Sequence, residues 1–474
     1  MDNAVERPAR YPVVIFVLLS TLFGPLLITA TPPMRGPDEP AHFIRAYGLS
    51  QGQIIPSLTD SEGRKGIFIP LRLQREMEVF EFARYHVGEP DFSYRQVFAD
   101  YARVRAEWSA GNDGAAEVFS LYGGSEGYSP APYLAYLPAV AAARLLGLDF
   151  LSTFYLMRAA GFVATTAIMA CAIVFAPCLR WAFLLIAMLP SALYARAVLS
   201  ADGSSLAFAL LVAALYLRSV GSVELARPWI VSLCLALCAL CKPPQIVFIM
   251  LEAMRTPLRK LPRYWRSLLV VLPAVILPAV WAQVSSADMA TWRNAAGAEF
   301  PPGYFDPLWR LRFMLEHPWH FPHMLAGALH SIADYWRQLI GVLAWLDEPL
   351  HPIAYPIISV LLLAAFCEPL DRTFQTRMRI AAFCAATALS YCLAVFLIFY
   401  LVWTRFDADQ VQGVQGRYFV IVLPLVAMTV SALVNRGLPV RARAGAAVLG
   451  AILSAASTLE AVLRVDWRLA LFLL

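Results

Sequence analysis

The pattern of apolar and polar residues along the chain predicts a bundle of membrane-spanning helices. Apolar runs recur over almost the whole length, and most are long enough, or nearly so, to cross the ~30 Å of hydrocarbon in a bilayer. The predicted spans are residues 11–30, 154–176, 181–197, 203–217, 229–241, 245–254, 268–284, 353–367, 380–403, 418–434 and 446–463. We therefore expect an all-α polytopic membrane protein with about 11 transmembrane helices.

Two long segments between the predicted spans are too polar to cross a membrane. The first is residues 31–153, and the second is residues 286–350. Within the first, apolar side chains recur at i, i+4, i+7 and i+11, as one stripe along a helix. These side chains are Val97, Tyr101, Val104 and Trp108. We expect a long, structured, helical first loop, which separates 1–30 from the spans in 154–285; residues 351–474 hold the C-terminal spans.

Basic residues gather in three short loops, which sets the expected orientation. The loops are residues 255–266, 372–379 and 436–443. Because cytoplasmic loops are enriched in Lys and Arg, we place these loops and the N-terminus in the cytoplasm. The C-terminus and both long segments are then outside. The apolar stretch 133–147 would reverse this assignment if it crossed, so we expect a helix that lies in the outer interface.

Composition supports membrane integration and argues against other classes. The chain is 59% hydrophobic and 15% charged, whereas a soluble domain carries about a quarter charged residues. The net charge of +5 reflects the basic loops and does not indicate a nucleic-acid partner. The first apolar run resembles a signal peptide, but its length favours an uncleaved span. None of the eight cysteines lies in residues 31–152, so no disulfide framework is expected.

The sequence directly after the first span combines prolines with two adjacent carboxylates. Residues 32–43 read PPMRGPDEPAHF, and the prolines predict a rigid, extended exit from the membrane. Asp38 and Glu39 then lie at the outer face. In a structural interpretation, one of them caps a helix that begins at Pro40. In a functional interpretation, a carboxylate at the bilayer face acts as a general base that takes the proton of an attacking hydroxyl.

Three basic residues are predicted at the same outer face: Arg45, Lys242 and Arg417. Cations here would stabilise an anionic lipid phosphate as it leaves. For Lys242, snorkelling to the interface is an equal alternative. Asp202 also falls at the outer end of a span, where capping of the fourth span is its structural alternative. The sequence identifies no cofactor, and a divalent metal ion is an open alternative to these cations.

Two other motifs are weak. Cys238 and Cys241 have the CxxC spacing, but they lie in an apolar helix, which favours a packing role. His317, His320 and His323 form a histidine cluster. Two intervening prolines break any helix that would align the three imidazoles, so the cluster is a poor metal site.

A series of motifs resembles the domain-of-unknown-function family 2142, a family of bacterial predicted membrane proteins. The motifs run in order over nearly the whole chain. They are residues 37–43 with 45–47, 129–133 with 136–138, 157–158, 200–202, 242–244, 341–347 and 413–419. The first and last motifs together are fairly specific. They contain His42 and Tyr418, which join the candidate site residues.

That family in turn resembles a branch of the GT-C glycosyltransferase superfamily, which includes protein O-mannosyltransferases and lipid A aminoarabinose transferases. The resemblance implies a polyprenyl-phosphate sugar donor and an active site at the outer face. It implies an acidic base in the first outer loop, which corresponds to Asp38 with Glu39 beside it. It also implies that Asp202 and Lys242 approach the donor. The Ser-Ala-Asp sequence that ends at Asp202 departs from the more usual Ser-Pro-Asp.

The expected function is therefore transfer of a sugar from a polyprenyl-phosphate donor to a cell-envelope glycan or a lipid-linked acceptor. The expected location is the bacterial cytoplasmic membrane, among membrane lipids, with the site on the periplasmic side. Two alternatives are a transporter or flippase of lipid-linked glycans and a polymerase that uses lipid diphosphate donors. A transporter should show charges in mid-span and internal repeats, and the sequence favours the enzyme because it shows neither.

Overall fold

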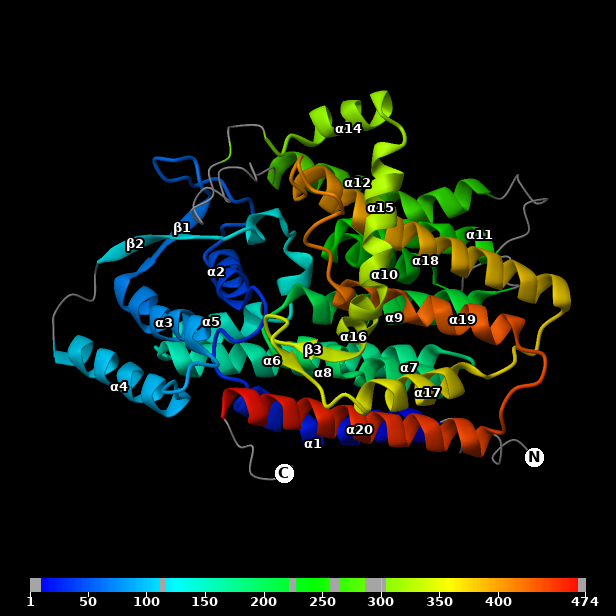
Figure 1. Cartoon of the computed structure of the whole chain (residues 1–474), viewed down its shortest axis with the longest axis horizontal. Helices are drawn as coiled ribbons and strands as arrows, with labels where there is room; N and C mark the ends of the chain where they lie inside the picture. Colours follow the sequence, from blue (N-terminus) through cyan, green and yellow to red (C-terminus); the bar gives the residue numbers. More distant parts are fainter. Residues whose placement is uncertain are drawn as a thin grey trace.

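The structure is a computed structural model that describes residues 10–110, 116–220, 227–255, 264–285, 300 and 304–467. Figure 1 shows long helices that run side by side, with a lobe built from the first long polar segment, residues 31–153, at one end of them. Helix α1 (Tyr11–Ala30) packs along α20 (Val440–Asp466) at one edge of the bundle. Beyond α20, the Trp467 ring stacks on Phe98 of the lobe, with 6.2 Å between ring centroids.

Within the part of the chain that the structure describes, seven helices are long and apolar enough to cross a membrane. They are α1, α6 (Phe150–Phe175), α9 (Ala201–Ser219), α12 (Tyr264–Ser285), α18 (Phe374–Val402), η8 with α19 (Gly416–Val422 and Leu423–Leu433) and α20. In α12 only 17% of the apolar window is buried, and Leu268, Leu269 and Leu272 are exposed. Such an apolar outer face suits contact with lipid chains rather than with water. The predicted all-α polytopic membrane fold is confirmed.

The four remaining predicted spans are shorter or broken helices. They are α7 (Arg180–Met188) with α8 (Pro190–Ala197), α10 (Pro228–Cys241), η5 (Pro243–Met250) with α11 (Leu251–Arg255), and α17 (Ala354–Phe366). Pro190 and Pro243 explain two of the breaks, because proline cannot continue a helix but suits its first turn. The stretch predicted at the interface holds only the nine-residue α5 (Leu137–Leu145). Its length of about 14 Å is well short of the bilayer core.

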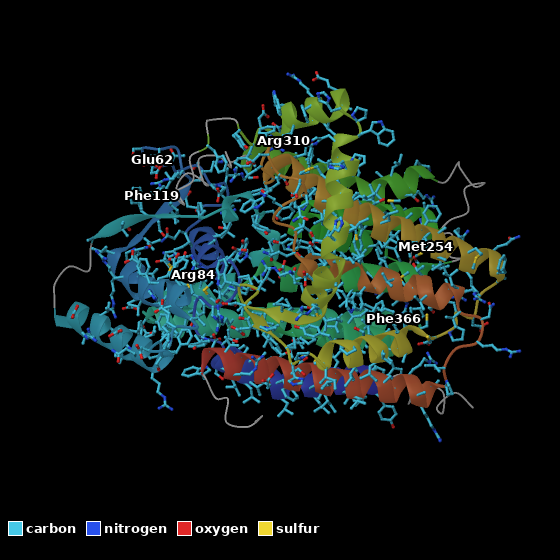
Figure 2. All side chains as sticks on the ribbon, in the orientation of Figure 1. Glu62, Arg84, Phe119, Met254, Arg310 and Phe366 are labelled. Carbon is cyan, nitrogen blue, oxygen red and sulfur yellow. The ribbon has the colours of Figure 1, made fainter. Side chains whose placement is uncertain are left out.

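The lobe has a core of its own, and it contains two strands that the helical prediction missed. Its elements are α2 (Glu39–Ser50), β1 (Gly66–Pro70), α3 (Leu71–Ala83), η2 (Arg84–His86), α4 (Tyr94–Ala110), β2 (Glu117–Leu121) and η3 (Ser125–Gly127). Strands β1 and β2 pair antiparallel, with Gly66 opposite Leu121. Val97 and Tyr101 of the predicted stripe are buried, while the side chain of Trp108 lies outside the described residues. Figure 2 labels Glu62, Arg84 and Phe119 on this lobe.

The described part of the second long polar segment, residues 286–350, is also mainly helical. It contains α14 (Pro307–Glu316), α15 (His320–Ala328), η7 (Leu329–Ser331), α16 (Ile332–Gly341) and a short hairpin of β3 (Val342–Leu343) and β4 (Glu348–Pro349). Figure 1 shows α15 crossing the direction of the long helices. Residues 286–299 and 301–303, and most of the predicted basic loop 255–266, lie outside the described residues.

Two of the predicted cytoplasmic loops meet at the end of the bundle opposite the lobe. Arg377 donates hydrogen bonds to the backbone oxygens of Ala432 and Val434, both at 2.8 Å. Arg443 forms an ion pair with Glu368. Helix α1 begins at this same end (Figure 1). These two basic loops therefore lie at one end of the bundle and the lobe at the other.

Candidate active site

A cavity of about 570 Å³ opens between the lobe and the bundle. One end of it is polar, where Asp38 and His42 of the lobe face Lys242 and Tyr418 of the bundle. The other wall is one apolar face of α18, with Tyr391, Val395, Ile398, Phe399 and Val402, and it continues to Trp403 directly after the helix. The cavity is thus polar at one end and apolar along one side.

Asp38 enters this cavity because of an unusual backbone conformation. Its φ of 55° is left-handed, which costs a non-glycine residue energy and is best tolerated by Asp and Asn. Asp38 occupies the N-cap position of α2, yet its side chain accepts no capping hydrogen bond. The capping interpretation therefore fails for its carboxylate. The side chain is 57% exposed, and its Oδ2 lies 3.7 Å from a terminal guanidinium nitrogen of Arg417.

Glu39 points the opposite way and is fully buried. Arg158 of α6 donates to both of its carboxylate oxygens, each at 2.8 Å. The backbone N–H groups of Gly36 and Leu199 donate to the same oxygens, at 2.8 and 2.9 Å. With each oxygen holding two donors, Glu39 has little capacity left for a substrate. This geometry favours a structural role over the catalytic role that the sequence predicted.

Two cations and one carboxylate lie at or beside the polar end of the cavity. Lys242 lines this cavity, whereas Asp202 and Arg417 line a smaller neighbouring one. Lys242 forms an ion pair with Asp202, and its Nζ lies 4.5 Å from the centre of the Tyr418 ring. Burial alone would lower the pKa of Lys242, but the Asp202 carboxylate together with three nearby tyrosines more than offsets this and raises the pKa above its ordinary value. Arg417 lies between Asp38 and Asp202, and its Nε is 3.7 Å from Oδ2 of Asp202. Lys242 is therefore charged at neutral pH.

The structural alternative for Asp202 was that it caps the fourth span, and this is wrong. Ser200 is the N-cap of α9, and its hydroxyl accepts a hydrogen bond from the Asp202 N–H at 2.8 Å. The Asp202 carboxylate is left for Lys242 and Arg417. Within the motif of residues 200–202, Ser200 thus caps α9 and Asp202 forms the ion pairs.

Arg417 is positioned by a close approach between two backbone segments. The N–H of Gly416 donates to Oε1 of Gln338 at 2.7 Å. A Cβ atom at position 416 would collide with the backbone carbonyl of Tyr335 in α16. Only glycine therefore lets η8 approach α16 this closely, and this contact fixes the residue that follows.

His42 and Tyr128 line the lobe side of the cavity, and the buried Tyr133 contacts His42 from behind. His42 Nδ1 lies 2.7 Å from the Tyr133 hydroxyl, and the imidazole meets the Tyr128 ring edge-on at 5.5 Å between centroids. Burial lowers the pKa of His42, and the Asp38 and Asp202 carboxylates only partly offset it. Burial also raises the pKa of Tyr128 to about 12. His42 is therefore a neutral hydrogen-bonding group at neutral pH.

Arg45 is the one predicted phosphate ligand that the structure places elsewhere. Its guanidinium is fully buried and donates to the backbone oxygens of Gln53 and Ile54, at 2.9 and 2.8 Å. It also lies over the rings of Tyr122 and Trp281. These contacts hold the chain that follows α2, so they favour a structural role for Arg45.

The two weak motifs show no geometry of a metal or redox site. All eight cysteines are free, and both Cys238 and Cys241 are buried in α10. His320 Nδ1 contacts the Tyr400 hydroxyl at 2.9 Å. Among the described residues, no three His, Cys, Asp or Glu side chains are arranged to hold a metal ion. Beside the cavity, the carboxylates of Asp38 and Asp202 both face side-chain cations.

Sequence reasoning missed two residues that shape this site. Arg158 was noted only as part of a motif, although an arginine within an apolar run signals a buried partner. Trp345 lines the cavity from the turn between β3 and β4. Its only sequence signal was membership of the motif 341–347.

A family model described as a predicted membrane protein, DUF2142, matches residues 21–426. The chain belongs to the DUF2142 family. The DUF2142 match contains Asp38, Asp202, Lys242 and Arg417. It ends before α20, which begins at Val440. No curated protein and no solved structure matches the chain.

Proposed function

We propose that this membrane protein is a glycosyltransferase that takes a sugar from a polyprenyl-phosphate donor. The acceptor is a cell-envelope glycan or a lipid-linked glycan at the outer face of the bacterial cytoplasmic membrane. Asp38 is the general base, and Lys242 and Arg417 bind the donor phosphate. The resemblance to GT-C glycosyltransferases points to the same activity.

The observation that carries this proposal is the division of one cavity into a charged end and an apolar wall. A polyprenyl-phosphate sugar has the same division, with a hydrocarbon chain on one side of its phosphate and a sugar on the other. The α18 face offers Val395, Ile398 and Val402 to a hydrocarbon chain. Lys242 and Arg417 lie next to the polar end of the cavity, where the phosphate that follows the hydrocarbon chain would bind. A cavity with apolar walls and a few convergent polar groups is typical of ligand sites.

The charges suit the proposed reaction. The acceptor hydroxyl oxygen bonds to the anomeric carbon while the bond from that carbon to the phosphate oxygen breaks. The phosphate keeps the bonding electrons and leaves on the lipid, and preorganised cations such as Lys242 and Arg417 stabilise the charge it gains. The hydroxyl proton passes to Asp38, whose carboxylate is exposed and only loosely paired.

A turnover assay with the full-length protein tests this proposal. The protein in lipid nanodiscs would receive radiolabelled polyprenyl-phosphate hexose or pentose donors and a cell-envelope glycan fraction. We expect release of polyprenyl phosphate that requires both the protein and the acceptor fraction. Movement of intact donor between leaflets without cleavage would contradict the proposal in favour of a flippase. Turnover of diphosphate donors alone would contradict it in favour of a polymerase.

A further inference from the structure

Trp345 is held at the cavity by a strained turn. The hairpin pairs Val342 with Pro349 and Leu343 with Glu348, and the turn between them presents the indole. The residues on either side of Trp345 both have left-handed backbones, with φ of 51° at Ala344 and 67° at Leu346. Left-handed conformations of non-glycine residues persist only when the surrounding structure enforces them, and they cluster at functional sites.

A buried arginine fixes this turn relative to Asp38. Arg35 is fully buried, and its guanidinium pairs with Asp347 at 2.9 Å and with Glu348 at 3.0 Å. Arg35 also pairs with Asp466 at the end of α20, at 2.7 Å. Because Arg35 precedes Asp38 by three residues, the turn and the proposed base share one rigid anchor.

The lobe supplies a second aromatic ring and a cation beside Trp345. The Arg84 guanidinium carbon lies 4.4 Å from the centre of the Trp345 ring and 4.6 Å from that of the Tyr85 ring. Oε1 of Glu81 lies 3.6 Å from a terminal guanidinium nitrogen of Arg84, and this ion pair restrains the arginine. Trp345 nevertheless keeps 37% of its surface exposed, and Tyr85 keeps 66%. Arg84 thus connects Trp345, which lines the cavity, with Tyr85 of the lobe, so that two exposed rings from segments far apart in sequence meet one cation.

We propose that Trp345, Arg84 and Tyr85 form a platform that binds a pyranose ring of the acceptor saccharide. The identification of this saccharide as the acceptor rests on the proposed function, whereas the saccharide site itself rests on this geometry. A pyranose ring presents a face of C–H groups, which an electron-rich aromatic face attracts, and a rim of hydroxyls, which a guanidinium or carboxylate can bind. Arg84 and the partly exposed Asp347 provide such groups beside the indole.

Position in the cavity assigns the acceptor rather than the donor to this platform. Trp345 and Asp38 line the same cavity. Arg84 and Tyr85 lie on the lobe, at η2, and not among the long apolar helices. A saccharide that reaches Asp38 from the lobe side would therefore cross this platform, while a lipid-linked donor would lie along α18.

Saturation-transfer NMR with the full-length protein in detergent tests the platform without requiring turnover. The probes are methyl pyranosides of a hexose, an N-acetylhexosamine and a 6-deoxyhexose. We expect saturation of ring C–H protons in at least one probe. Trp345→Ala should weaken its binding roughly threefold to tenfold, as loss of one aromatic contact does. Trp345→Phe should retain most of the binding. Trp319→Ala, at an exposed tryptophan outside the cavity, should leave it unchanged.

The outcomes separate this inference from the proposed function. No saturation of any probe, or equal binding by wild type and Trp345→Ala, would overturn the platform even if donor turnover occurs. A lower unfolding temperature of Trp345→Ala with unchanged probe binding would show a purely structural clamp, which also overturns it. Probe binding that depends on Trp345 without any donor cleavage would keep the saccharide site and remove the glycosyltransferase.

Discussion

Two neighbouring carboxylates, Asp38 and Glu39, meet arginines in opposite ways. Glu39 and Arg158 are both fully buried, and two hydrogen bonds of 2.8 Å join them. Asp38 and Arg417 approach only to 3.7 Å, and the Asp38 side chain is more than half exposed. The carboxylate oxygens of Glu39 are fully occupied by hydrogen-bond donors, whereas the carboxylate of Asp38 can still accept hydrogen bonds from a substrate. The contrast separates a group that builds the site from a group that can react in it.

Arg158 makes this contrast possible because it holds the exit from the first span. Besides Glu39, it donates to the backbone oxygens of Ile28 and Pro32, at 3.2 and 2.9 Å. The end of α1, the proline-rich segment and the start of α2 are therefore tied to α6. With position 39 fixed in this way, the left-handed backbone at position 38 turns its side chain toward the cavity.

The largest effect on stability is expected from breaking the Glu39–Arg158 pair. Glu39→Gln keeps the size of the side chain but leaves a buried arginine without its counter-charge, which typically costs about 3–5 kcal/mol. We expect a large fall in the unfolding temperature of the purified protein. Glu78→Gln is the matched control, since its Arg75 partner lies at the surface and such pairs contribute about 0–1 kcal/mol. Equal stability of the two variants would contradict a structural role for Glu39.

Removal of either cavity cation should impair use of the donor. Lys242→Met and Arg417→Met each delete a group proposed to stabilise the leaving phosphate, for which losses of about 10²–10³ in kcat are typical. Steady-state kinetics should show a larger defect when the donor is varied than when the acceptor is varied. Arg103→Met, at an exposed arginine of α4, is the control. Normal donor saturation in both cavity variants would remove these residues from the phosphate site.

A smaller effect is expected from Gly416→Ala. The added methyl group would collide with the Tyr335 carbonyl, and overpacking of this kind costs about 1–3 kcal/mol. Because Arg417 follows directly, donor use should fall as well. Gly445→Ala is the control, since its Cβ would meet open space. A variant at position 416 with wild-type stability and donor use would show that this contact does not position Arg417.

The smallest effect concerns the pH dependence of stability through His42. Burial lowers its pKa, so the unfolded chain takes up a proton at a higher pH than the folded protein. The stability that this group contributes is complete above the unfolded pKa of about 6.5 and is lost as the pH falls toward the folded pKa. Acidification should destabilise wild type more than His42→Gln, by at most about 1.4 kcal/mol per pH unit. Parallel pH profiles of thermal unfolding would contradict this.

The sequence predicted the helical bundle and several site residues for clear physical reasons. Long apolar runs specify spans, and charges at the ends of those runs mark residues that face the interface. Asp38, Lys242 and Arg417 were found in this way, and the structure brings them together. Strands β1 and β2 were missed because their pairing joins residues about fifty positions apart, and no local pattern encodes it.

The sequence could not separate Asp38 from Glu39, nor Arg45 from the two cavity cations. The direction of each side chain depends on partners that are distant in the chain, such as Arg158, or on backbone carbonyls that carry no sequence signal, such as those of Gln53 and Ile54. Charge and topology place a residue near an interface. Only tertiary packing decides whether its charged group is paired within the protein or can contact a substrate.

The most direct test of the account is the activity of Asp38→Asn per amount of folded protein. Asn tolerates the left-handed backbone at this position, and the Asp38 side chain makes no capping bond, so folding should be unchanged. Only the ability to take a proton is lost, and loss of a general base costs about 10²–10⁴ in rate. We predict wild-type expression and unfolding temperature with polyprenyl phosphate release reduced by that factor. Release at the wild-type rate from a normally folded Asp38→Asn protein would contradict the assignment of Asp38 as the base.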